Sequence, residues 1–142
     1  SVQPAPAGFH ARYGARRKWY RYTIWNSPER PFFNRNYVLH VPTPLNIAAM
    51  RKAARLLKGR HDFRDFHSTG RPVRSTVRTL RGLTLSKKGP FIQIDAEADG
   101  FLYHMVRRIV GSLIEVGKGK PVPAIPPTAP AQGLCLMEVY YR

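Results

Sequence analysis

The sequence predicts an α+β domain in which two main helices pack on a largely antiparallel β-sheet. In several short runs the apolar residues recur at every second position, as they do in strands. In two longer runs they recur at three- and four-residue spacing, as on the buried side of a helix. Single helical runs alternate with pairs of strand-like runs, an order typical of α+β domains. The 142 residues, with 43% hydrophobic content, suit a single domain over residues 1–142.

Two strands are expected first. Residues 18–25 alternate in character, which predicts a strand. Its two faces would carry Tyr20 and Tyr22 on one side and Arg21 on the other. Residues 37–41 predict a second, shorter strand, and we expect it to pair with the first by an antiparallel return.

The first main helix is expected directly after the run PTP at 42–44. Thr43 is suited to cap this helix, and Pro44 is suited to its first position. Gly59 is suited to end it. An apolar stripe at helical spacing supports the prediction, formed by Ile47, Met50, Ala54 and Leu57.

A β-hairpin is expected next in the chain. Residues 76–85 and 91–98 predict its strands, and the run KKGP between them is a turn signal. In the second strand the apolar residues share one face, whereas Asp95 and Glu97 project from the other.

The second main helix is expected over residues 101–116, with an apolar stripe that predicts burial against the sheet. The opposite side holds a polar set that this stripe does not explain: His104, Arg107, Arg108, Gly111 and Glu115. Residues 117–133 are rich in glycine and proline, so we expect a linker there, before a last strand over residues 134–141.

Positive charge is the most pronounced feature of the composition. The chain has 24 Lys+Arg against 8 Asp+Glu, which gives a net charge of +16 and a pI near 11.0. Such a surface indicates a polyanionic partner. The run ARYGARRKWYRYTIW interleaves cations with aromatic rings, which favours RNA, because phosphates attract the cations and unpaired bases stack on the rings. The candidate RNA-binding residues are Arg12, Arg16, Arg17, Lys18, Arg21, Arg71, Arg74 and Arg108.

Several kinds of chemistry have no support in the sequence. It lacks the phosphate-binding GxxxxGK[ST] run, a GxGxxG run after a strand, and the HExxH run of zinc peptidases. The five histidines are scattered and Cys135 is the one cysteine, so we expect no metal site and no disulfide framework. Asp62 and Asp65 lie three residues apart, but local capping and ion pairing explain them better than glycosidase chemistry does.

No apolar run is long enough to span a membrane, and the first residues lack the features of a signal peptide. We therefore expect a protein of the cytoplasm, with an organelle as the alternative.

Four runs together resemble the C-terminal half of the TruA family of tRNA pseudouridine synthases. In chain order they are GFHARYGARRKWYRYTIWN, AARLLKGRHDFRDF, DGFLYHMVRRIVGSLIEVGKGK and PTAPAQGLCLMEVYY. The resemblance implies a pseudouridine synthase-like fold and isomerisation of uridine to pseudouridine in the anticodon arm of tRNA, without metal or organic cofactor. It also implies tRNA as the partner and a homodimer as the assembly.

The resemblance further implies roles for single residues. In this family an aspartate acts as nucleophile toward a base that is flipped out of the RNA. A tyrosine lies against the uracil and is the candidate base for the proton at C5, and here it corresponds to Tyr20. An arginine of the HMVR run pairs with the aspartate and corresponds to Arg107, and a leucine that packs on the base corresponds to Leu134. His104 lies on the same side of the helix as Arg107 and is a candidate substrate contact.

A physical argument supports the role of Arg107. A carboxylate that stays ionised in a pocket needs a fixed cation nearby, and arginine supplies one at any physiological pH. Without the resemblance, however, a solvated helix side explains Arg107 equally well. A buried cross-strand aromatic likewise explains Tyr20.

The aspartate itself has no counterpart in the sequence. In the family it lies in a G-R-T-D-x-G-V-H segment of an N-terminal half, and none of the candidate carboxylates matches that segment: Asp62, Asp65, Asp95 and Asp99. The chain is therefore either part of a synthase that requires an N-terminal half with the catalytic aspartate, or a derived RNA-binding module. In both cases we expect the chain alone to bind RNA without turnover, because the covalent step is missing.

Two other functions compete with the synthase. A non-catalytic basic RNA-binding module, such as a ribosome-associated protein, explains the charge and the aromatic residues. Binding to heparin-like or membrane polyanions explains the charge but none of the four runs.

Overall fold

The computed structural model describes residues 15–32, 37–67 and 73–141. Two predicted RNA-binding residues, Arg12 and Arg71, lie outside the described residues, and so does the side chain of Arg16.

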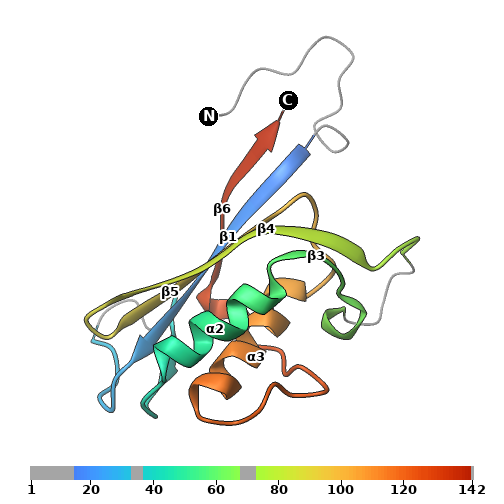
Figure 1. The fold of residues 1–142 in the computed structure, drawn as a ribbon. Helices are drawn as coiled ribbons and strands as arrows, with labels where there is room; N and C mark the ends of the chain where they lie inside the picture. The colour runs from blue at the N-terminus through green and yellow to red at the C-terminus, as the bar shows by residue number, and fades with distance from the viewer. Residues whose placement is uncertain (1–14, 33–36, 68–72, 142) are drawn as a thin grey trace.

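The described chain forms two layers. One layer is a six-stranded sheet in which every strand pairing except one is antiparallel. The other layer consists of the helices α2 (Ile47–Leu57) and α3 (Met105–Gly117), which lie together on one face of the sheet (Figure 1). This arrangement confirms the predicted α+β class, with two main helices on a largely antiparallel sheet.

The strand β1 (Ala15–Asn26) is an interior strand of the sheet. It pairs antiparallel with β5 (Phe91–Ala98) along one edge and with β6 (Leu134–Tyr141) along most of the other. The predicted alternation is confirmed, since Tyr22 and Ile24 are completely buried on the helix side of the sheet. The strand β6 has the predicted bounds.

The direction of β2 (Leu39–Val41) corrects a prediction. This strand runs parallel to β1, with Leu39 opposite Ile24, and not antiparallel as expected. Because β6 occupies the edge of β1 as far as Tyr22, only the last residues of β1 remain for β2. The connection of residues 27–38 is long enough for a crossover, which a parallel pairing requires.

The predicted hairpin is confirmed. It consists of β4 (Val77–Lys88) and β5, and Gly89 takes a positive φ of 58° in the turn between them. The strand β3 (Gly59–Asp62) was not expected, and it extends the sheet beyond β4. This strand is short, polar and largely exposed, so it has no apolar alternation that could reveal it.

The start of α2 corrects a second prediction. Its N-cap is Asn46, whose Oδ1 accepts a hydrogen bond from the Ala49 N–H over 3.1 Å, and not Thr43. The Asn46 N–H donates to the carbonyl of Gly117 at the end of α3. A tertiary contact therefore keeps the preceding residues extended and fixes the first turn of the helix, which a local capping pattern cannot show.

The helix α3 begins four residues later than expected. Residues 101–104 precede it in irregular backbone, and His104 takes the left-handed conformation with φ 63° and ψ 9°. Beyond this turn the helix is buried on most of its surface, including Met105, Ile109 and Leu113 in the core.

The glycine- and proline-rich connection of residues 117–133 lies against α3 near the middle of the helix. Ala129 is buried, and its N–H donates to the Arg107 carbonyl over 3.0 Å. Gly111 permits this approach, because a Cβ at that position would overlap the Pro127 carbonyl. Part of the helix side that carries the polar residues is therefore covered by this connection.

The substitution Gly111→Ala should destabilise the protein. An added methyl group gains about 1 kcal/mol of helix propensity. It also forces the backbone at Pro127 away, so the free energy of unfolding should fall by about 1–3 kcal/mol overall. Denaturant unfolding measures this change. The control is Gly82→Ala, whose Cβ would meet Glu97 only at ordinary contact distance and should leave stability unchanged or raised. Equal stability of Gly111→Ala and the original protein would contradict the close packing.

Candidate functional site

A cavity of about 340 Å³ lies between the start of α3 and the strands β1 and β6. Its walls include Lys18 and Tyr20 from β1, Leu134 from β6, and Tyr103, His104 and Arg107 from the entry into α3. The structure thus brings together all four residues predicted for catalysis or substrate binding, namely Tyr20, His104, Arg107 and Leu134. Their roles remain predictions, but their placement in one cavity is a feature of the fold.

Tyr20 forms one side of the cavity. Its ring packs edge-to-face on Phe101, with centroids 5.1 Å apart and planes 85° apart. Burial raises the pKa of the Tyr20 phenol, so this group is protonated at neutral pH. The aromatic ring is therefore held in place by packing, and the phenol is a hydrogen-bond donor.

Arg107 is anchored to the connection that covers α3. Its Nε donates to the Ala129 carbonyl over 2.7 Å, while the Ala129 N–H donates back to the Arg107 carbonyl. These two bonds hold both the backbone and the side chain of Arg107 against Ala129. Among the described residues, no carboxylate pairs with the guanidinium and none lines the cavity.

Tyr22 holds the next residue of the same connection. Its hydroxyl donates to the Pro130 carbonyl over 2.6 Å, and its ring is completely buried. Burial raises the pKa of Tyr22 to about 12, and the positive charge of Arg107 acts in the opposite direction with a smaller effect. The neutral phenol of Tyr22 therefore supports the segment that positions Arg107.

His104 lies at the entry to α3, and its imidazole stacks on Tyr103 with ring centroids 3.8 Å apart. Burial lowers the pKa of His104, and the neighbouring charges of Arg107 and Arg108 lower it further. The ring is thus uncharged at neutral pH.

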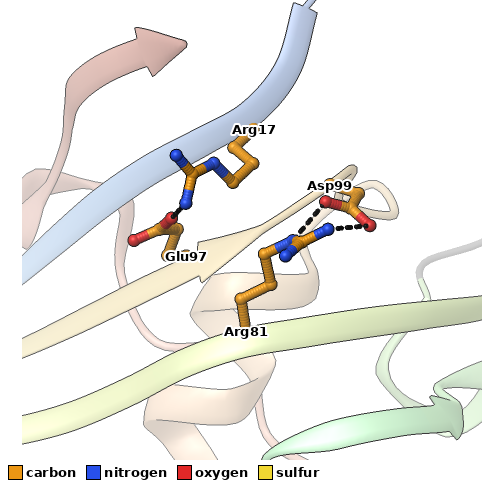
Figure 2. A network of polar contacts seen from close by, with 4 residues as sticks. All are labelled: Arg17, Arg81, Glu97 and Asp99. Atoms are coloured by element: carbon orange, nitrogen blue, oxygen red, sulfur yellow. Dashed lines mark hydrogen bonds and ion pairs between the residues drawn. The ribbon is translucent and has the colours of Figure 1, made fainter. Parts of the chain in front are cut away.

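Two predicted RNA-binding arginines form ion pairs on the open face of the sheet, opposite the helices. Arg21 reaches Asp95 with two bonds, from Nε at 2.8 Å and from Nη2 at 3.2 Å. Arg17 reaches Glu97 at 2.8 Å, and Figure 2 shows this pair beside a similar one between Arg81 and Asp99. Much of the charge of these arginines is therefore balanced within the protein, and RNA contact by Arg17 and Arg21 stays a prediction.

The remaining predicted RNA contacts differ in their surroundings. Lys18 lines the cavity, and Arg74 is exposed. Arg108 packs against a short 3-10 turn instead, where its Nη1 donates to the Asp65 carbonyl over 3.2 Å and its Nε is buried. Contact of these three residues with phosphate also stays a prediction.

Several residues that shape the site were not predicted from the sequence. Phe101 and Tyr103 line the cavity, and Tyr22 and Ala129 act through the connection. The run GFLYH contains both aromatic residues and overlaps the start of the predicted helix with the polar side, so it was the available signal. The contacts of Ala129 had no local signal, because they join segments far apart in the chain.

Two further features are absent from the part of the chain that the structure describes. No helix there is long and apolar enough to cross a membrane. No group of three or more His, Cys, Asp or Glu side chains in the same residues is arranged to hold a metal ion.

Comparison with known proteins gives consistent matches. A family model described as tRNA pseudouridine synthase matches residues 53–126, which is more than half of the chain. The tRNA pseudouridine synthase A of Moorella thermoacetica is 50% identical over 99% of the chain and 62% of its own length. The proteins of the same name from Ruminiclostridium cellulolyticum and Geobacillus kaustophilus are 46% and 43% identical. The chain spans about three fifths of the length of these relatives.

The buried phenol of Tyr22 should make stability depend on pH in the alkaline range. It ionises near pH 10 in the unfolded chain and near pH 12 in the folded protein. Its contribution to the free energy of unfolding is thus complete below pH 10. This contribution, about 2 to 3 kcal/mol, is lost between pH 10 and 12. Unfolding measured across this range should show the loss, and Tyr22→Phe should have a shallower pH dependence. If the free energy of unfolding depended on pH equally in the two proteins, the raised pKa of Tyr22 would be contradicted.

Proposed function

The chain belongs to the family of tRNA pseudouridine synthases, and from this premise we propose that it forms one side of an active site that isomerises uridine to pseudouridine in tRNA. The observation that carries this proposal is the cavity in which Tyr20, Arg107 and Leu134 meet. It offers an aromatic ring, a fixed cation and an apolar wall to a single flipped-out base.

The reaction in question needs no external reagent. The bond between N1 and C1′ of the nucleotide breaks, and a bond between C5 and C1′ forms. The proton at C5 leaves and N1 gains a proton, so substrate and product have the same composition. The protein therefore has to hold the detached base, supply a nucleophile and move a proton.

Arg107 is suited to hold a carboxylate nucleophile in place. Its Nε is occupied by Ala129, and the described residues provide no acidic partner for the rest of the guanidinium. A carboxylate beside it would form a charge-assisted hydrogen bond and stay ionised. We propose that this carboxylate is the aspartate of an N-terminal half, donated from outside the 142 residues.

Tyr20 is suited to contact the uracil. A flipped base loses the stacking that it had in the RNA, and an aromatic ring in the pocket restores part of it. Removal of the C5 proton by Tyr20 would require the phenolate, which burial disfavours. Contact with the base has no such requirement, so it is the role that the surroundings of Tyr20 support better.

Leu134 and His104 complete the proposed base-binding surface. Leu134 of β6 pairs with Tyr22 of β1, and its apolar side chain lines the cavity. His104 is uncharged at neutral pH and lies beside Arg107 at the start of α3. Both residues can contact a neutral base without the cost of burying a charge.

The proposed partners are tRNA and the N-terminal half, within a homodimer, in the cytoplasm or the organelle where tRNA is modified. The uridine would lie in the anticodon arm, as the family resemblance implies. The net charge of +16 supports a strong electrostatic contribution to tRNA binding.

A non-catalytic RNA-binding module is the second candidate. The absence of a carboxylate from the cavity walls, among the described residues, favours it as much as it favours a divided active site. The two functions differ in one respect, because only the synthase would gain activity when the aspartate is supplied.

The purified chain should bind tRNA, with an affinity that falls steeply as salt rises, and should not release tritium from C5-labelled uridine. Addition of the N-terminal half of the Moorella relative should restore release, because it supplies the nucleophile. The matched control is the same half with its catalytic aspartate changed to asparagine, which should restore nothing. Catalytic turnover by the chain alone would contradict the divided site, and binding without any restored turnover would favour the non-catalytic module.

A further inference from the structure

Tyr103 is an exposed aromatic residue in the wall of the cavity. Its side chain is 60% exposed, although it lies directly beside Leu102 and Met105, which are buried in the core. One face of its ring is covered by the His104 imidazole, at 3.8 Å between centroids and 25° between planes. The 60% exposure of the residue indicates that the opposite face of the ring is open to solvent.

The backbone at His104 makes this stack possible. Neighbouring side chains point to opposite sides in a strand and about 100° apart in a helix, so they do not normally lie parallel. His104 is the one residue other than glycine with a positive φ among the described residues. Such a conformation costs about 1–2 kcal/mol for an L-residue. Here it accompanies a stack of the two rings, with planes 25° apart, in the wall of the cavity.

We propose that the free face of Tyr103 is a stacking platform for a second unpaired nucleobase, the neighbour of the uridine that enters the cavity. This inference rests on the proposed function, since it adds a subsite to the same pocket. A nucleobase is the ligand class that fits a rigid, exposed aromatic ring beside cations, because stacking on such a ring needs no hydrogen-bond partner.

The surroundings of the platform support this ligand. The His104 ring behind Tyr103 is neutral near pH 7, because burial and two arginines lower its pKa. Lys18 lines the same cavity and is the cation available for the phosphate that joins the two nucleotides. The platform should favour a purine over a pyrimidine, because the larger ring covers more of the tyrosine face.

The test uses the 142-residue chain and a single-stranded RNA that contains one uridine with 2-aminopurine beside it. Stacking quenches the fluorescence of 2-aminopurine. The original protein and Tyr103→Trp should quench it. Tyr103→Leu, which keeps an apolar side chain but loses the aromatic face, should abolish the quenching and weaken RNA binding by about tenfold. The matched control is Tyr37→Leu, at an exposed tyrosine of the β2 region outside the cavity, which should leave both unchanged.

The outcomes separate this inference from the proposed function. If RNA binds with full affinity and Tyr103→Leu behaves like the original protein, the platform is wrong while the proposed function stands. If the original protein does not bind RNA at all, the proposed function fails first. Damage to the fold cannot imitate a positive result, because Tyr103→Trp should retain quenching and Tyr103→Leu should unfold at the same denaturant concentration as the original protein.

Discussion

The anchoring of Arg107 to Ala129 is the contact on which the site depends. Two hydrogen bonds join these residues. The Arg107 Nε donates to the Ala129 carbonyl, and the Ala129 N–H donates to the Arg107 carbonyl. They form because the connection before β6 lies close to α3, where Gly111 leaves room for its backbone. The phenol of Tyr22 holds the same connection from the sheet. A cation fixed in this way keeps its position without a carboxylate partner, so it is ready for one supplied by another segment.

Charge is distributed differently on the open face of the sheet and in the cavity on the helix side. On the open face of the sheet, acidic residues of β5 pair with Arg17 and Arg21, so that face is partly neutralised in a chain of net charge +16. Exposed pairs of this kind add about 1 kcal/mol or less to stability, and their main effect here is on the electrostatic potential. The cavity on the helix side has cations and no acidic residue among its described walls. The cations of the cavity wall therefore have no acidic neighbour in that wall, which suits a phosphate or a carboxylate.

Much of the fold could be predicted from the sequence, and two of the wrong predictions have a common cause. Periodicity located the hairpin, the last strand and both helices, because burial of one face leaves a local pattern. The parallel direction of β2 and the start of α2 at Asn46 both depend on distant segments, which no local pattern records. The pairing of Arg21 with Asp95 was hidden for the same reason. For the site, the resemblance led to Tyr20, Arg107 and Leu134, and the helix side shared with Arg107 led to His104. Tyr103 and Ala129 emerged only from the packing.

We propose that Arg107 faces the catalytic carboxylate. Carbon-13 NMR of that carboxylate tests the pairing, in the chain reassembled with an N-terminal half carrying labelled aspartate. Arginine within about 4–6 Å lowers the pKa of a carboxyl group by about 1–3 units, so Arg107→Ala should raise the pKa of the aspartate by a comparable amount. The substitution Arg74→Ala, which removes an exposed arginine outside the cavity, should leave it unchanged. An aspartate pKa that is the same with and without Arg107 would contradict the account.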